Sequence, residues 1–267
     1  MKALDFIYDD VQLSSLGYMI CTFDPGSGIS TANSGCQIDF ETVTSRHTGA
    51  LLKTSAWYDS CLESTFCICK NVNHQSQSEI TVEEMRELVG WLNRKAFRPL
   101  RFIDSDWDGI YFMASFGVAR CEHYGVLVGL ELTMTTDKPY ALGNTVLLQS
   151  DVEAGGSMMV QNTSDEIGAT YPSSIEITCG AAGDLDIYNE QGKLHTVVRN
   201  CSAGEVISIS PYWQMISSSL ASHKVQNDFN YVFPKLVRTF ADRNNTFTFS
   251  LPCSVSFSYT PVVKAFL

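Results

Sequence analysis

Most of the chain alternates between apolar and polar residues with a period of two, the pattern of β-strands that bury one face. The longest example is GVLVGLELTMTT, which places Val126, Val128, Leu130, Leu132 and Met134 on one face. Shorter examples precede it in FIYDDVQL, GYMICTF, QIDFETV, FCICKNV, PLRFI and IYFMASFGVA, and others follow it in TVLLQS, SMMVQN, SIEITC, DLDIYN, HTVVRN, EVISIS, TFTFS and VSFSY. The pattern therefore predicts a protein that is mainly β.

One segment, residues 81–97 (TVEEMRELVGWLNRKAF), has the period of an amphipathic helix instead. Thr81 and Glu84 have the spacing of a capping box, and Pro99 forbids continuation of the helix. Because strands flank the segment, we expect its apolar face to pack on a β-sheet. The residues predicted to face this core are Val82, Met85, Leu88, Val89, Leu92 and Ala96. Trp91, on the flank of the stripe, either covers the sheet of its own chain or anchors an interface.

Turn signals divide the chain into two predicted domains. Residues 1–142 form an N-terminal β-sandwich or α+β domain that carries the helix, with loops over DPGSGISTANSG (24–35) and SRHTGALLK (45–53). Residues 143–267 carry short strands separated by Gly, Asn and Ser, which predicts an antiparallel β-sandwich of the jelly-roll or galectin-like kind. The final strand, within 254–267, either completes this sandwich or returns to the first domain.

Charge and composition narrow the possible functions. The 267 residues are 45% hydrophobic and 18% charged, as in ordered globular proteins, and the net charge is -11. With only 18 Lys and Arg residues, a surface that neutralises nucleic-acid phosphates is not expected. Neither a signal peptide nor an apolar run of membrane-spanning length is recognisable, so we expect the cytoplasm, or a particle assembled there, and no membrane insertion.

The nine cysteines give no metal or disulfide motif. They lack a repeated C-x-x-C spacing, and the closest pair, Cys67 and Cys69, would share one face of a strand with Ile68 on the other. We therefore expect reduced, buried cysteines, no metal and no cofactor. The cysteines are Cys21, Cys36, Cys61, Cys67, Cys69, Cys121, Cys179, Cys201 and Cys253. Five scattered histidines, His47, His74, His123, His195 and His223, give no support to a Cys-His nucleophile pair.

One motif, Asp104-Ser-Asp106-Trp-Asp108-Gly109, matches the opening of a calcium loop. The twelfth position, which should supply a bidentate Glu, is Ser115, and strand-like segments flank the motif. The motif is therefore interpreted as a hairpin turn rich in Asp and Gly.

Taken in order, these segments resemble the distal tail protein family of long-tailed (siphovirus-like) phages and prophages. The resemblance runs through FIYDDVQLSSLGYMI, the helix with its WLNRKAFRPLRF continuation, the hairpin ending in IYFMA, and TTDKPYAL. In the second half it includes SSIEIT, GEVISIS, NDFNYVFPKL, NNTFTFS and VSFSYTPVVK.

The resemblance implies a structural, non-enzymatic virion protein at the tail tip or baseplate. Six copies would form a ring from residues 1–142, with the second domain outside and a channel for DNA. The implied partners are the tail tube protein and the hub or fibre proteins, and further candidates are the tape measure and receptor-binding proteins. Assembly would take place in the host cytoplasm.

Two other functions compete with this one. A carbohydrate-binding module that recognises host surface glycans would use aromatic platforms, for which Tyr188, Tyr212, Trp213, Tyr231 and Phe233 are candidates. A hydrolase of cell-wall polymers would need paired carboxylates in a cleft, yet the acids here mostly occupy turns such as DSDWDG and NTSDE. No catalytic residue is therefore assigned.

The Asp104–Asp108 turn is predicted not to bind calcium, because the bidentate twelfth ligand is missing. Titration calorimetry should detect no site with a Kd at or below about 10⁻⁵ M, the limit of sensor sites. Binding tighter than this limit that is lost in Asp106→Asn would contradict the prediction.

Overall fold

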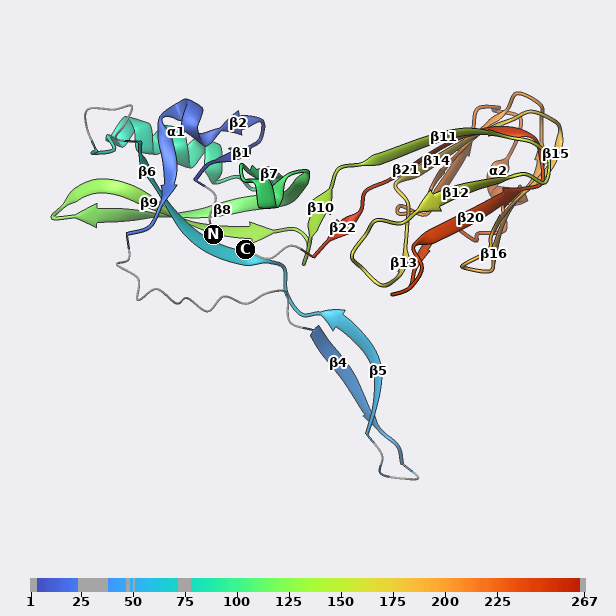
Figure 1. Cartoon of the computed structure of the whole chain (residues 1–267), viewed down its shortest axis with the longest axis horizontal. Coiled ribbons are helices and arrows are strands. Elements are labelled where there is room, and N and C mark those ends of the chain that lie inside the picture. The colour runs from blue at the N-terminus through green and yellow to red at the C-terminus, as the bar shows by residue number, and fades with distance from the viewer. Residues whose placement is uncertain (1–3, 24–37, 47–48, 50, 72–77, 265–267) are drawn as a thin grey trace. The chain divides into compact units, whose positions relative to one another are not determined.

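The computed structural model describes residues 4–23, 38–46, 49, 51–71 and 78–264 (Figure 1). The chain divides into two compact units. Unit 1 contains the described residues up to Leu142, together with Lys264, and unit 2 is Gly143–Val263. Strands predominate in the described residues, so the predicted β-rich class is confirmed. None of the helices in the described ranges is long and apolar enough to cross a membrane.

Unit 1 is built on an antiparallel sheet with the strand order β2-β1-β7-β8-β9-β6-β3. Its elements are β1 (Phe6–Tyr8), β2 (Val11–Gln12), η1 (Leu13–Leu16), β3 (Tyr18–Cys21), β6 (Glu63–Lys70), α1 (Val82–Leu92), β7 (Arg98–Phe102), η2 (Ser105–Trp107), β8 (Ile110–His123), β9 (Val126–Thr136) and β10 (Ala141–Gly143). One face of this sheet carries the core, in which Phe6, Phe66 and Phe116 pack ring against ring with centroids 6.0 Å apart.

The alternation predicted for the longest strand is present in β9. Leu130, Leu132 and Met134 are fully buried. Val128 is half-buried and Val126 is exposed, because both lie near the β8–β9 turn, where less of the chain covers the sheet. The inward face therefore becomes a closed core only from Leu130 onward.

Helix α1 starts where the sequence predicts and ends earlier. The hydroxyl of Thr81 accepts a hydrogen bond from the backbone N–H of Glu84 (3.2 Å), and the Glu84 carboxylate accepts one from the N–H of Thr81 (2.7 Å). The predicted end at residue 97 is wrong. Asn93 leaves the helical conformation and donates its side-chain amide to the carbonyl of Phe116 (2.8 Å), and the Ser115 hydroxyl donates to the carbonyl of Arg94. These bonds to β8 draw the chain out of the helix.

The buried face of α1 is rotated relative to the prediction. Only Leu88 and Leu92 are buried, Met85 and Val89 are half-buried, and Val82 and Ala96 are exposed, so six core positions were too many. The difference arises from Trp91, whose ring stacks on Phe6 (centroids 5.8 Å apart) and donates Nε1–H to the carbonyl of Tyr8 (3.1 Å). Trp91 thus covers the sheet of its own chain.

A separate two-stranded hairpin, β4 (Ile38–Thr44) and β5 (Leu51–Tyr58), belongs to no larger sheet in the described part of unit 1. The loop predicted over residues 45–53 is therefore too long, since β5 begins at Leu51. The hairpin has no buried face in the described chain, which removes the alternation that would have revealed β5. The loop predicted over residues 24–35 lies outside the described residues.

Unit 2 is an antiparallel sandwich of a five-stranded sheet, β11-β21-β14-β17-β18, and a four-stranded sheet, β12-β20-β15-β16. Its elements are β11 (Val146–Val152), β12 (Ser157–Gln161), β13 (Gly168–Thr170), β14 (Ser174–Cys179), β15 (Gly183–Asn189), β16 (Leu194–Cys201), β17 (Val206–Ser210), β18 (Met215–Ser218), α2 (Val225–Asp228), β19 (Leu236–Arg238), β20 (Asn244–Phe249), β21 (Cys253–Tyr259) and β22 (Val262–Val263). All eight predicted strands are present, whereas β13, β18, β19 and α2 were not predicted.

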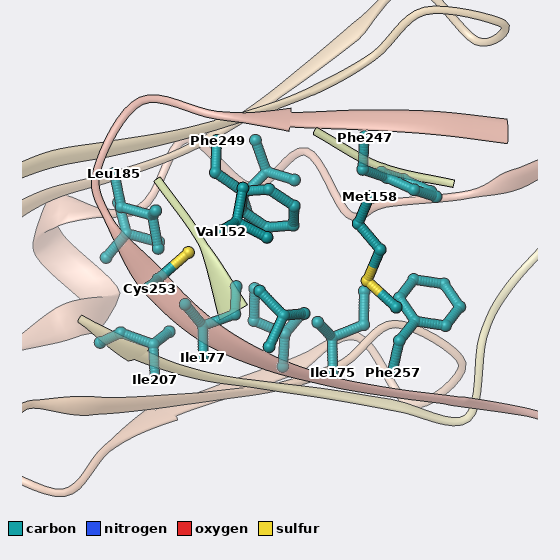
Figure 2. Packing of buried hydrophobic residues seen from close by; sticks show 14 of the residues in the cluster. Val152, Met158, Ile175, Ile177, Leu185, Ile207, Phe247, Phe249, Cys253 and Phe257 are labelled. Atoms are coloured by element: carbon teal, nitrogen blue, oxygen red, sulfur yellow. The ribbon is translucent and has the colours of Figure 1, made fainter. Parts of the chain in front are cut away.

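Alternate residues of the two sheets meet in one hydrophobic core (Figure 2). It includes Ile175, Ile177 and Phe257 from the five-stranded sheet and Leu185, Phe247 and Phe249 from the four-stranded sheet. The predicted sandwich is therefore present, because the alternate apolar residues of both sheets point inward into one core.

The final segment is two strands, not one. β21 lies between β11 and β14 in the five-stranded sheet, and β22 pairs with β10 after a break at Thr260 and Pro261. The N–H of Gly143 donates to the carbonyl of Pro261 (2.9 Å), so the first and last residues of unit 2 lie side by side.

Leu92→Ala should lower the free energy of unfolding of unit 1 by about 2–5 kcal/mol, because it opens a cavity between α1 and the sheet. Val82→Ala, on the same helix but exposed, should change it by less than about 0.5 kcal/mol. Urea unfolding followed by tryptophan fluorescence measures both. Equal effects of the two substitutions would show that the observed rotation of the helix is wrong.

Candidate functional site

Seven of the cysteines in the described ranges lie on strands of the two units, and Cys61 lies in the connection between β5 and β6. Cys67 and Cys69 share one face of β6 with the fully buried Ile68 on the other, as the sequence indicates. Prediction of burial is correct for three cysteines and wrong for five. Cys179, Cys201 and Cys253 are buried, whereas Cys21, Cys61, Cys67, Cys69 and Cys121 are half-buried, and Cys36 lies outside the described residues. Within the described ranges, His, Cys, Asp and Glu side chains form no group of three or more suited to a metal.

The aspartate-rich motif is the connection between β7 and β8. It forms the short 3₁₀ turn η2, in which the Asp104 carboxylate accepts the backbone N–H of Asp106 (3.1 Å). Both flanks are strands, so the hairpin interpretation is confirmed. Ser115, at the position of the missing ligand, lies within β8 and bonds the carbonyl of Arg94.

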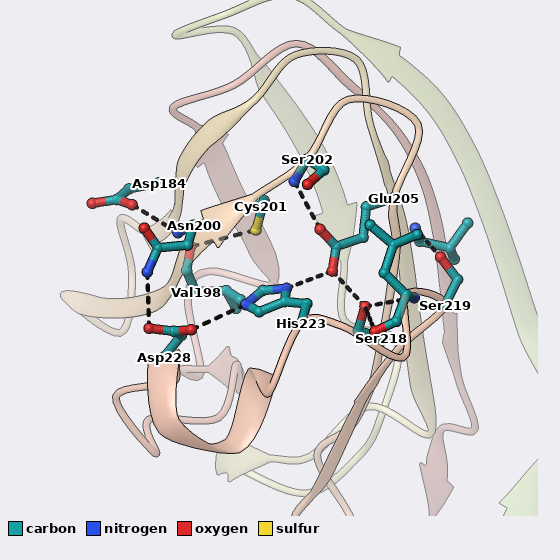
Figure 3. Close-up of polar contacts among 12 residues, drawn as sticks. Asp184, Val198, Asn200, Cys201, Ser202, Glu205, Ser218, Ser219, His223 and Asp228 are labelled. Carbon is teal, nitrogen blue, oxygen red and sulfur yellow. Dashed lines mark hydrogen bonds and ion pairs between the residues drawn. The ribbon is translucent and has the colours of Figure 1, made fainter.

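The most developed polar arrangement is a buried cluster in unit 2 (Figure 3). Glu205, in the turn between β16 and β17, is fully buried. Its carboxylate accepts hydrogen bonds from the Ser202 backbone N–H (2.7 Å) and the Ser218 hydroxyl, and it lies 2.5 Å from Nδ1 of His223. On the other side of the ring, Nε2 of His223 is 3.4 Å from the carboxylate of Asp228. The histidine therefore stands between two carboxylates.

The two central groups of the cluster stabilise each other's charge. Burial opposes the charge of Glu205, but bonds from Ser218, Ser202 and His223 outweigh it and lower the pKa of this carboxyl. Burial likewise opposes the charge of His223, yet the hydrogen bond and charge of Glu205 raise the pKa of the imidazole. Both shifts favour the ionic form of the pair.

This arrangement does not have the order of a catalytic triad. In a triad the histidine stands between the nucleophile and the acid, whereas here Glu205 stands between Ser218 and His223. Both ring nitrogens face carboxylates, which leaves no nitrogen to take a proton from a hydroxyl. The cluster instead fastens the segment from His223 to Asp228 onto the β16–β17 turn.

Sequence reasoning missed these contacts because they depend on strand pairing. His195 meets Asp186 (2.8 Å) across β15 and β16, and His223 meets Glu205 from 18 positions away. A search for histidines placed opposite acidic residues in predicted hairpins would have found the pair of His195 and Asp186. His123 lies at the end of β8, while His47 and His74 lie outside the described residues.

The candidate sugar-binding aromatics do not form flat platforms. The exposed rings of Tyr212 and Trp213 are perpendicular, at 88°. Tyr231 is tilted by 49° from the buried Phe229, which also packs against Phe233 at 70°. Tyr188 is half-buried and stacks on His195. The two exposed rings that are in contact, Tyr212 and Trp213, are therefore not coplanar.

The β4–β5 hairpin exposes large apolar side chains. Phe40 and Trp57, on its two strands, are each about half accessible to solvent (49% and 51%). Ile38 and Val43 are also exposed, and Lys53 lies over the ring of Phe40 (4.2 Å). The register pairs Phe40 with Ala56 and Trp57 with Asp39, so the two large rings are exposed on opposite faces of the hairpin. An isolated hairpin is marginally stable in water, and exposed large apolar side chains favour contact with another protein.

Models of two protein families match almost the whole chain. Residues 1–138 match the phage tail protein N-terminal domain, and residues 140–259 match the phage tail C-terminal domain. The chain belongs to this family of phage tail proteins. The sequence matches none of the curated proteins with which it was compared.

The fold of this phage tail protein is also that of a solved structure. The crystal structure of the phage SPP1 Dit (gp 19.1) protein, described as a paradigm of the hub adsorption apparatus in phages that infect Gram-positive hosts, superposes with a TM-score of 0.65. The match covers 97% of this chain and 99% of that chain at 14% sequence identity. The resemblance to distal tail proteins read from the sequence is confirmed, and the protein is a structural component of the virion tail.

The stability of unit 2 should be greatest between the lowered pKa of Glu205 and the raised pKa of His223. As pH falls through the former, Glu205 loses its charge and its contribution disappears. The contribution of His223 is complete below its unfolded pKa and is lost as pH rises through its raised folded pKa.

Denaturant unfolding from pH 3 to pH 9 measures this dependence. His223→Gln should remove the decline on the alkaline side, whereas His195→Gln, at the exposed pair with Asp186, should leave it nearly unchanged. An unaltered profile in His223→Gln would show that the cluster does not control the pH dependence.

Proposed function

We propose that the protein forms a six-fold ring at the tip of the phage tail, between the tail tube above and the hub or fibre proteins below. The observation that carries the proposal is the match of both units, in one chain, to a protein described as a hub of the adsorption apparatus. A match of one sandwich alone would be shared by many unrelated proteins. The proposal assigns no enzymatic activity.

The surfaces of unit 1 fit a ring. Its sheet ends in two short edge strands, β2 and β3, and its hairpin carries exposed apolar side chains. Unpaired edges and apolar patches favour contact with another chain unless they are covered. A head-to-tail contact that closes by rotation covers both and gives a cyclic oligomer. We assign the ring to residues 1–142 and place unit 2 outside it.

The charge fits a channel for DNA. The net charge of -11 per chain gives a strongly acidic assembly. Acidic groups that line a central opening repel phosphates, so the genome passes without binding.

The purified protein should have six times the 29.6 kDa mass of the chain in light scattering at about 10 µM, and it should appear as closed rings in negative stain. Phe40→Ser combined with Trp57→Ser should give monomers, because each lost interface anchor costs roughly 2 kcal/mol or more. Tyr212→Ser combined with Trp213→Ser, which removes two exposed rings of unit 2, should leave the rings intact.

The proposal of a ring would be contradicted if the wild-type protein remained monomeric both by itself and when mixed with the tail tube protein. If the Phe40 and Trp57 substitutions leave the rings intact and the Tyr212 and Trp213 substitutions abolish them, unit 2 forms the ring and the two units have been assigned the wrong roles.

A further inference from the structure

Two buried cysteines of unit 2 lie directly opposite each other on neighbouring strands. Cys179, the last residue of β14, is the register partner of Cys253, the first residue of β21. Both are buried, with 0% and 5% of their surface exposed. Figure 2 shows Cys253 among the buried residues of the core, which also include Leu185, Ile177 and Ile207.

The hydrogen bonds around Cys179 determine which kind of antiparallel pair this is. The N–H of Cys179 donates to the carbonyl of Glu205 (2.9 Å), and its carbonyl accepts from Gly204 (2.7 Å), so both backbone groups point away from β21. The next pair along the ladder is hydrogen-bonded, since Gly180 donates to the carbonyl of Pro252 (2.7 Å). Cys179 and Cys253 are therefore a non-hydrogen-bonded pair.

This distinction matters for disulfide formation. In such a pair the Cα atoms are about 4.5 Å apart and the side chains approach most closely. A disulfide usually joins Cα atoms about 4.4–6.8 Å apart. The backbone therefore already holds Cys179 and Cys253 within bonding range, and no strand has to move.

We propose that Cys179 and Cys253 form an oxidation site, which peroxide converts into a cross-strand disulfide that joins β14, the central strand of the five-stranded sheet, to its neighbour β21. The site is a property of unit 2 alone and does not depend on the proposed ring. In the reducing cytoplasm the two residues are thiols, and the disulfide forms when the protein meets an oxidant.

Cys179 is the residue that attacks the oxidant. The thiol of Cys201 is a hydrogen-bond neighbour of Cys179, and this bond lowers the pKa of Cys179 in spite of burial. Cys201 also lies 3.5 Å from the carbonyl of Val198, which is visible in Figure 3. Having one S–H proton, it bonds a charged Cys179 thiolate in preference to that neutral carbonyl. Burial raises the pKa of Cys253 to about 11, so Cys253 remains a thiol.

The reaction then takes two steps. The Cys179 thiolate attacks one oxygen of hydrogen peroxide, the O–O bond breaks, and hydroxide leaves, which gives a sulfenic acid on Cys179. The sulfur of Cys253 attacks the Cys179 sulfur, the S–O bond breaks, and water leaves as Cys253 loses its proton. Two thiols are oxidised and one peroxide is reduced to two molecules of water.

Cys201 is the competing partner for the sulfenic acid. It belongs to β16 in the opposite sheet and its thiol contacts Cys179, but it has no strand register with Cys179 that would hold the two Cα atoms opposite each other, as Cys253 has. Its role is to donate to the thiolate of Cys179, and the register favours Cys253 as the residue that closes the bond.

Peptide mapping of the full-length protein after treatment with hydrogen peroxide tests the site. The expected product is a linked pair of peptides that contain Cys179 and Cys253, two mass units lighter than the separate peptides. Cys253→Ser should lose the link and leave a sulfenic acid on Cys179 that dimedone traps. Cys201→Ser should keep the link but form it more slowly. Circular dichroism checks that each variant is folded, and Cys253→Ala replaces Cys253→Ser if the serine disturbs the core.

A second measurement uses stability. The disulfide should raise the midpoint of thermal unfolding of unit 2 by roughly 5–15 °C, and reductant should reverse the change. The half-buried cysteines of unit 1 also react with peroxide, so Cys69→Ser serves as the matched control and should keep the shift. Peroxide-treated wild-type protein without the Cys179–Cys253 link, or with Cys179 linked to Cys201, would overturn the proposal.

Discussion

The fold of both units depends on burying every second side chain of their strands. In β9 this requirement places Leu130, Leu132 and Met134 in the core while Glu131 and Thr133 stay exposed between them. In unit 2 the same alternation occurs in two sheets that face each other, so each sheet supplies the cover for the other. A shift of register by one residue would turn an entire apolar row toward water, and this fixes the strand pairing.

Where a sheet has no second sheet to cover it, other groups must do so. In unit 1 the cover comes from α1, and Trp91 contributes both its ring and its indole N–H. The buried Lys70 extends this attachment, because its ammonium group pairs with Glu84 at the start of α1 (2.8 Å). Glu84 also closes the capping box, so one carboxylate both begins the helix and binds it to β6.

The sequence was sufficient to predict an element where a segment has one buried face. It was insufficient where hydrogen bonds to distant parts of the chain decide where an element ends or how it pairs. The eight main strands of unit 2 and the start of α1 could be predicted, because alternation and capping are local. The end of α1 could not, since Asn93 meets Phe116, and Arg94 meets Ser115, only in the folded chain. Strand β19 is held partly by a side chain. Asn245 accepts the N–H of Val237 (2.7 Å) and donates to its carbonyl (2.9 Å), in place of a backbone partner. The ion pair of His223 and Glu205 joins residues 18 positions apart and leaves no local signal.

The junction at Gly143 and Pro261 has a consequence for the history of the chain. Unit 2 begins and ends at adjacent positions, and the chain continues from it to Lys264, which groups with unit 1. In topology, unit 2 is therefore an insertion into unit 1. An insertion with adjacent ends can be exchanged or enlarged by recombination without disturbing the strand order of its host. A unit joined in this way can change in size or sequence while the strand order of the receiving sheet stays the same.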